Sequence, residues 1–159
     1  MRVIAIDPGY DRIGIAIIEK KKNGDEKVLF SECFLTNKKE DVNNRIYSLG
    51  LRINELIKKY KPSFLAIESL FFSKNTKTAL FVAEARGVII FNGLKNNLLI
   101  YEYTPNQIKI AVTGNGAAHK KDILFMIPKI INIDVKNMID DELDAIAIGL
   151  TFLASWRNY

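Results

Sequence analysis

The sequence has few of the residues that form cross-links, metal clusters or chain breaks. Its 159 residues include one cysteine, one histidine, one tryptophan and four prolines. One cysteine excludes an internal disulfide, and one histidine argues against a histidine-based zinc site or a hydrolase triad. No apolar run approaches the roughly 18 residues of a membrane span, since Asp7 and Pro8 interrupt the first one. We therefore expect a cytoplasmic protein without a membrane segment.

The composition is that of an ordinary globular protein. Hydrophobic residues make up 48% and charged residues 26% of the chain, and the length suits one domain over residues 1–159. The 23 basic and 18 acidic residues leave a net charge of +5 and a pI near 9.2. This excess is compatible with a polyanionic partner but does not identify one.

The first third of the chain predicts an antiparallel meander. Residues 2–7 and 12–19 are dense in β-branched residues and flank the turn signal Pro8-Gly9. A charged turn over residues 20–28, with Asn23-Gly24 in its middle, leads to a third predicted strand over residues 28–35.

The rest of the chain alternates predicted helices with short strands. Apolar residues recur at helical spacing from Val42 to Ile57, and Pro62 ends that helix. Later segments predict strands over 64–68 and 98–104 and helices over 75–97, 106–112, 122–131 and 141–156. Strands joined by helical crossovers run parallel, so we expect an α/β fold with a five-stranded mixed sheet and helices on both faces. This order matches an RNase H-like layout.

Four carboxylates each interrupt an apolar run. Asp7 ends the first strand, Glu68 ends the fourth, and Asp141 and Asp144 are three residues apart on one face of the last helix. Strand ends of an open α/β sheet are where sites are built, so these side chains can meet there. Oxygen ligands without a histidine or cysteine set favour a hard ion, Mg²⁺ or Mn²⁺, and two such ions can hydrolyse a phosphodiester.

Each carboxylate also has a structural explanation. Asp7 could cap the Pro8-Gly9 turn, and Glu68 could pair with Arg86. Residues 140–142 could be first-turn acids that the helix dipole favours. Asp144 lies deeper in its helix among apolar residues, so a shared cation site explains the set more simply.

Five sequence blocks occur in an order that resembles the RuvC family of Holliday junction resolvases. They are "AIDPG" with "GIAI", "AIESLFFSKN", "EARGV", "NQIKIAVTGNGAAHKK" and "DELDAIAIG". The resemblance implies an RNase H-like, homodimeric, Mg²⁺-dependent endonuclease. Such an enzyme nicks two strands of a four-way DNA junction symmetrically in recombination and repair. It also implies two Mg²⁺ ions per site, with Mn²⁺ able to substitute, and a branch-migration helicase complex as a further partner.

The same resemblance assigns residues to roles. The catalytic, metal-binding acids are Asp7, Glu68, Asp141 and Asp144, and Lys120 assists them by neutralising a phosphate. Phe71 inserts at the junction, where a ring can stack on an unpaired base. The full set expected to contact DNA is Phe71, Phe72, Lys74, Lys109, Lys120 and Lys121. Packing under the following helix is the alternative for the two phenylalanines.

The helix segment Ala79–Phe91 is apolar over much of its circumference. Its small residues Ala83, Ala85 and Gly87 would permit close approach of a two-fold copy, which suits a substrate with two symmetry-related cuts. The alternative is a central helix of a monomeric core.

Two other functions remain open from the residues. One is a YqgF-type RNase H-fold nuclease that acts on RNA, against which the long apolar helix and Phe71-Phe72 count. The other is a non-catalytic, structure-specific DNA-binding protein, which would have little need for four converging acids. His119 is expected to be a loop residue first and a proton carrier second, and Asp140 adds a further carboxylate beside Asp141.

Overall fold

Five strands form one mixed sheet in the computed structural model, which describes residues 1–70 and 76–156. The strands are β1 (Arg2–Asp7), β2 (Arg12–Lys20), β3 (Glu26–Leu35), β4 (Phe64–Glu68) and β5 (Leu99–Tyr103). Their order across the sheet is β3-β2-β1-β4-β5. The first three pair antiparallel, while β4 runs parallel to both β1 and β5, as expected.

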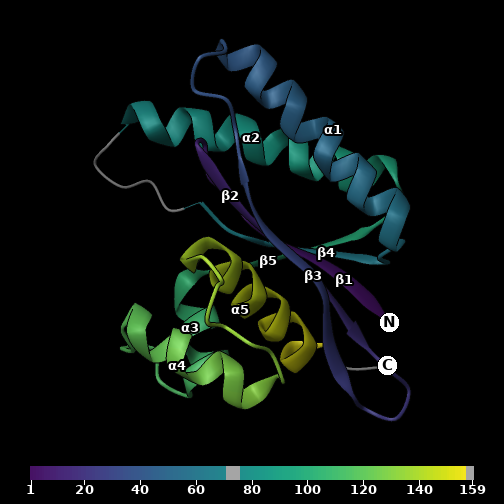
Figure 1. Cartoon of the computed structure of the whole chain (residues 1–159), viewed down its shortest axis with the longest axis vertical. Coiled ribbons are helices and arrows are strands. Elements are labelled where there is room, and N and C mark those ends of the chain that lie inside the picture. The colour runs from purple at the N-terminus through teal and green to yellow at the C-terminus, as the bar shows by residue number, and fades with distance from the viewer. Residues whose placement is uncertain (71–75, 157–159) are drawn as a thin grey trace.

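Helices cover both faces of this sheet (Figure 1). They are α1 (Val42–Tyr60), α2 (Thr76–Lys95), α3 (Pro105–Thr113), α4 (Lys120–Ile130) and α5 (Asp140–Ser155). The helices α1 and α2 lie together on one face, and α3, α4 and α5 lie on the other. The predicted fold class, an RNase H-like α/β fold with helices on both faces, is confirmed.

The alternation of side chains along β1 divides the core into two layers. Ile4 and Ile6 point toward α1 and α2, whereas Val3 and Ala5 point toward α5, and all four are fully buried. Burying an isoleucine side chain contributes about 1.5–3 kcal/mol, so strands that are apolar on both sides need helices on both sides.

Glycines bring α5 unusually close to the sheet. A Cβ on Gly14 of β2 would lie 2.0 Å from the backbone oxygen of Asp141, and one on Gly149 would lie 2.5 Å from the Cδ1 of Ile18. At Gly14 the obstacle is backbone, so only glycine fits, whereas at Gly149 the end of the Ile18 side chain would have to move. The N-terminal end of α5 is thus held against the strand that neighbours β1.

Local signals set the starts of α3 and α4. Thr104 and Gln107 form a capping box around Pro105, the first-turn proline that the sequence predicts. The backbone N–H of His119 donates to Asp122 Oδ2 at 2.8 Å, so α4 begins two residues before its predicted start. Pro128 lies inside α4 near its end, and the helix continues through it as predicted.

One detail of the α2 prediction is wrong. Ala85 is buried with Ile89 in the protein's own core, so it cannot face a second copy. The large apolar side chains that α2 exposes are Leu80, Phe91 and Leu94. Within residues 1–70 and 76–156, no helix combines the length and hydropathy needed to cross a membrane.

Candidate active site at the edge of the sheet

Two carboxyl groups meet where two parallel strands end. Asp7 is the last residue of β1 and Glu68 the last of β4, and the preceding pair, Ile6 and Ile67, is in register. Parallel neighbours bring their carboxyl ends to one edge of the sheet. The two carboxyl groups lie close enough together there for each to affect the pKa of the other.

The α5 helix brings two more acids to the same edge. Asp141 and Asp144 lie in its first turns, and the Asp141 backbone touches Gly14, which is the register partner of Asp7. Both aspartates are close enough to Asp7 for their charges to raise its pKa. The four predicted acids therefore share one neighbourhood, although they come from the front, middle and end of the chain.

Burial and repulsion make the strand acids weak acids. Burial, followed by the charges of Asp144 and Asp141, raises the pKa of Asp7 to about 6. Burial, followed by the charge of Asp7, raises the pKa of Glu68 to about 7. Ionising both groups is therefore costly near neutral pH unless a cation lies between them.

The helix acids already have cationic partners. Asp144 accepts a hydrogen bond from Lys120 Nζ at 2.8 Å, and the same ammonium lies 3.6 Å from the exposed carboxylate of Asp140. Burial still raises the pKa of Asp144, with Lys120 acting against it. Asp141 accepts two hydrogen bonds from the guanidinium of Arg12.

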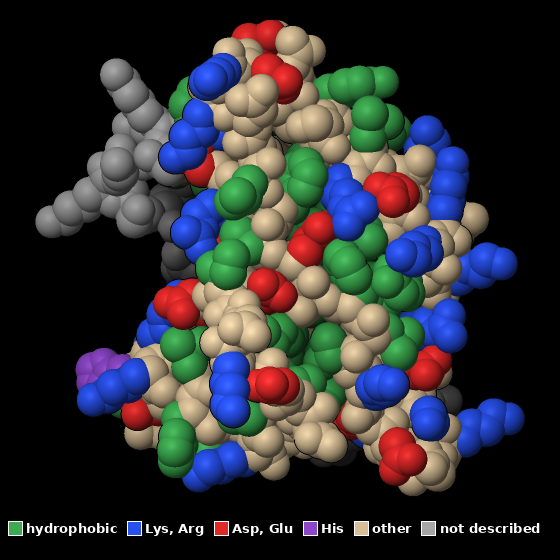
Figure 2. All heavy atoms as spheres, viewed as in Figure 1, with side chains coloured by type: hydrophobic (Ala, Val, Ile, Leu, Met, Phe, Trp, Pro, Cys, Tyr) green, Lys and Arg blue, Asp and Glu red, His purple; other side chains and the backbone are tan. Residues whose placement is uncertain are grey.

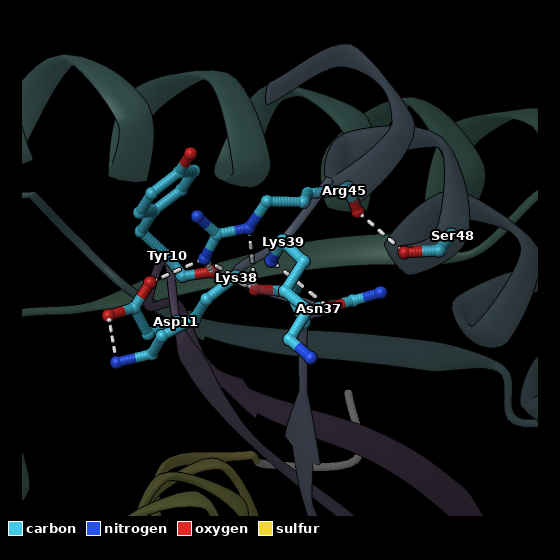
Figure 3. Close-up of polar contacts among 8 residues, drawn as sticks. Tyr10, Asp11, Asn37, Lys38, Lys39, Arg45 and Ser48 are labelled. Atoms are coloured by element: carbon cyan, nitrogen blue, oxygen red, sulfur yellow. Dashed lines mark hydrogen bonds and ion pairs between the residues drawn. The ribbon is translucent and has the colours of Figure 1, made fainter. Parts of the chain in front are cut away.

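A buried arginine of α1, Arg45, holds the turn after β1 in place (Figure 3). The Arg45 guanidinium donates to Thr36 Oγ1, to the Tyr10 carbonyl and to Asp11, and its Cζ lies 3.7 Å from the centre of the Tyr10 ring. Hydrogen bonds from Lys38 and Arg45 lower the pKa of Asp11. This network ties the turn that follows Asp7 to α1.

The predicted basic residues lie at different places around the acids. Lys109 and Lys120 line one cleft together with Glu68 and Asp144, so both border the acids. Lys121 is exposed at the start of α4. Three predicted DNA contacts, Phe71, Phe72 and Lys74, lie outside the described residues.

Two of the structural explanations considered for the acids can be compared with the observed partners of Arg86 and Glu142. Arg86 forms an ion pair with Glu102, not with Glu68. Glu142 has a structural role at the start of α5, since it accepts hydrogen bonds from Ser31 Oγ and from the Ile139 N–H. Of the four acids assigned by the resemblance, Asp7 and Glu68 lie close together, whereas Asp141 and Asp144 are near Asp7 but paired with basic residues.

The donor set suits a hard divalent ion, although the side chains do not form a closed cage. In the part of the chain that the structure describes, no three histidine, cysteine or acidic side chains lie close enough together to enclose a metal. Asp141 and Asp144 are instead turned to Arg12 and Lys120. The acids offer only oxygen ligands, which Mg²⁺ and Mn²⁺ prefer, and a cation would relieve the repulsion that raises the pKa of Asp7 and Glu68.

Sequence reasoning missed Arg12. The residue begins β2 and its partner Asp141 is 129 positions away, so no local pattern links them. The only available signal was a basic residue five positions after Asp7, at the start of the strand that pairs with β1.

The face of the molecule in Figure 2 shows no broad basic surface. Lysine and arginine side chains on this face are scattered among acidic and apolar ones. This face therefore does not by itself mark a path for a polyanion.

Comparisons with known proteins identify the family of this chain. The family model described as "Crossover junction endodeoxyribonuclease RuvC" matches residues 3–152. The protein of that name from Brachyspira hyodysenteriae is 45% identical, and the match covers 100% of this chain and 98% of that protein. The one from Fusobacterium nucleatum is 43% identical, and the match covers 98% of this chain and 81% of that protein. The structure of Thermus thermophilus RuvC in complex with a Holliday junction substrate matches with a TM-score of 0.89 and 27% identity, covering 96% of this chain and 93% of that one. The chain belongs to the RuvC family of crossover junction endodeoxyribonucleases.

Proposed function

We propose that this protein is a structure-specific endonuclease that resolves four-way DNA junctions by paired symmetric nicks in recombination and repair. The observation that carries the proposal is the meeting of Asp7, Glu68, Asp141 and Asp144 at one edge of an RNase H-like sheet. Membership of the family supports the reaction class. The Thermus thermophilus relative bound to a Holliday junction supports the substrate.

Divalent ions are part of this proposal. Two Mg²⁺ ions, for which Mn²⁺ could substitute, would activate a water and stabilise the leaving oxygen of the phosphodiester. Asp7 is central at the sheet edge and is suited to contact both ions. Glu68 on one side and Asp141 with Asp144 on the other would each hold one.

Basic residues around the acids would hold the DNA backbone. Lys120 and Lys109 border the cleft beside Glu68, where they can neutralise phosphates as negative charge develops. Lys121 lies one residue further along α4 and can add a backbone contact. Phe71, Phe72 and Lys74 lie a few residues after β4 in the sequence, so we retain them as proposed contacts to the junction centre.

A homodimer is proposed because two cuts related by a two-fold axis need two sites. The helices α1 and α2 pack side by side and expose large apolar side chains: Tyr47, Leu51, Leu80, Phe91 and Leu94. A groove between the two helices is lined by several of them. This surface would pack against its copy in the partner subunit. A branch-migration helicase complex, acting on the same junction in the cytoplasm, is the proposed further partner.

The test is a synthetic mobile four-way junction incubated with the protein and Mg²⁺. We expect two nicks at symmetric positions on a denaturing gel, none on a linear duplex of the same arms, and none in EDTA. Preference for a structured RNA would favour a YqgF-type nuclease. Junction binding without metal-dependent cutting would favour a non-catalytic protein. Mass in solution should equal that of a dimer.

A further inference from the structure

Among the residues that the structure describes, Arg12 is a cation at the site to which the proposed chemistry gives no role. Its Nε and Nη2 donate to a single oxygen, Oδ2 of Asp141, at 3.0 and 2.5 Å. The Arg12 side chain is 50% exposed, whereas that of Asp141 is 23% exposed. The guanidinium thus approaches the acid from the solvent side and does not lie beneath it.

This pairing has little value for folding. An ion pair that is exposed on one side contributes little stability. Within residues 1–70 and 76–156, Asp141 is the oxygen acceptor of the Arg12 guanidinium, and the Cys33 thiol on β3, a weak acceptor, also lies within its reach. A guanidinium has five N–H donors in a fork that matches a phosphate, so part of its binding capacity is not used by the protein.

Arg12 and Lys120 make the same kind of contact with α5. Each is an exposed cation from a different element, β2 or α4, and each holds one helix aspartate, at 2.5 and 2.8 Å. A divalent ion bound to Asp141 would repel the guanidinium and compete for its acceptor oxygen. The released side chain would then lie beside the reacting strand, where phosphate oxygens are the available acceptors.

We propose that Arg12 is a phosphate-binding residue of the nuclease site, which exchanges Asp141 for a backbone phosphate of the junction when Asp141 binds a metal ion. The proposal rests on the proposed function, because it requires both DNA and metal at this edge of the sheet. It extends the proposed DNA contact set to β2.

The test compares Arg12→Gln with Arg2→Gln, which removes the same charge from the Arg2–Glu19 pair at the other end of β1. Junction affinity is measured by fluorescence anisotropy in Mg²⁺ at several salt concentrations, before nicks accumulate. Mg²⁺ affinity is measured without DNA by thermal shift. For Arg12→Gln we expect junction affinity to fall about 5- to 10-fold, and the salt slope to become less steep by about one per site.

The two affinities should move in opposite directions. Arg12→Gln should bind Mg²⁺ about 2- to 5-fold more tightly, because it removes a cation that competes for Asp141. Arg2→Gln should change neither affinity, and Arg12→Lys should keep most of the salt slope. Loss of junction and metal affinity together, or behaviour identical to Arg2→Gln, would overturn the role of Arg12. Failure of the unmodified protein to bind the junction would overturn the proposed function as well.

Discussion

The two halves of the acidic site are neutralised in different ways. The strand half, Asp7 and Glu68, is partly buried and brings two carboxyl groups close together, with pKa values of about 6 and 7. The helix half, Asp141 and Asp144, is paired with the exposed cations Arg12 and Lys120. The strand half therefore needs protons or added ions to neutralise its carboxylates. The helix half already has cationic partners, so a metal ion that binds there would have to displace Arg12 or Lys120.

The largest expected effect is on the strand half. Asp7→Asn should reduce junction cutting more than about 1,000-fold, because it removes a ligand suited to both proposed ions. Junction binding should stay equal or become tighter, because a charge that repels phosphates is lost. Asp140→Asn is the matched control, since Asp140 is exposed and outside the four-acid set. Near-normal cutting by Asp7→Asn would remove Asp7 from the site.

A smaller effect is expected from the cation of the helix half. Lys120→Met should slow cutting about 100-fold, because a positive charge beside the developing phosphate charge is lost. The adjacent Lys121→Met should weaken binding only a few-fold, and only at low salt. Single-turnover rates at saturating protein separate the two effects. Equal loss in both variants would mean that Lys120 acts only as a backbone contact.

The smallest effect concerns stability. The pKa of Glu68 is raised, so the folded protein binds more protons than the unfolded chain and loses stability as pH rises from about 4.5 to 7. Glu68→Gln should thus stabilise the metal-free protein at pH 8 by about 1–2 kcal/mol, allowing for partial exposure, and raise Tm by several degrees. At pH 4.5 the gain should disappear, because Glu68 is then neutral. Thermal unfolding in EDTA at both pH values measures this, and a gain at pH 4.5 would contradict it.

The sequence predicted the fold well because the periodicity of β1 and its neighbours is unambiguous. Ile4 and Val3 must face opposite sides of the sheet, so helices on both faces follow from the pattern alone. The acids could be found because each interrupts an apolar run. Ala85 was misplaced because a small residue on an apolar helix looks the same whether it faces a core or a partner.

The ion pairs of the site could not be predicted. Arg12 and Asp141 meet only after β2 has paired with β1 and α5 has packed on the sheet, and neither residue carries a local signal of the other. The same holds for Arg86, whose partner is on β5 and not on β4. Such contacts depend on register and helix rotation, which periodicity does not specify.

Gly14 sets the spacing between strand and helix on which the chemistry depends. A methyl group there would need to move the Asp141 backbone by more than an ångström, from 2.0 Å to an ordinary contact distance. The carboxylates would then separate although every reactive group was still present. An alanine at this position, although small and uncharged, would therefore behave like the loss of a catalytic residue.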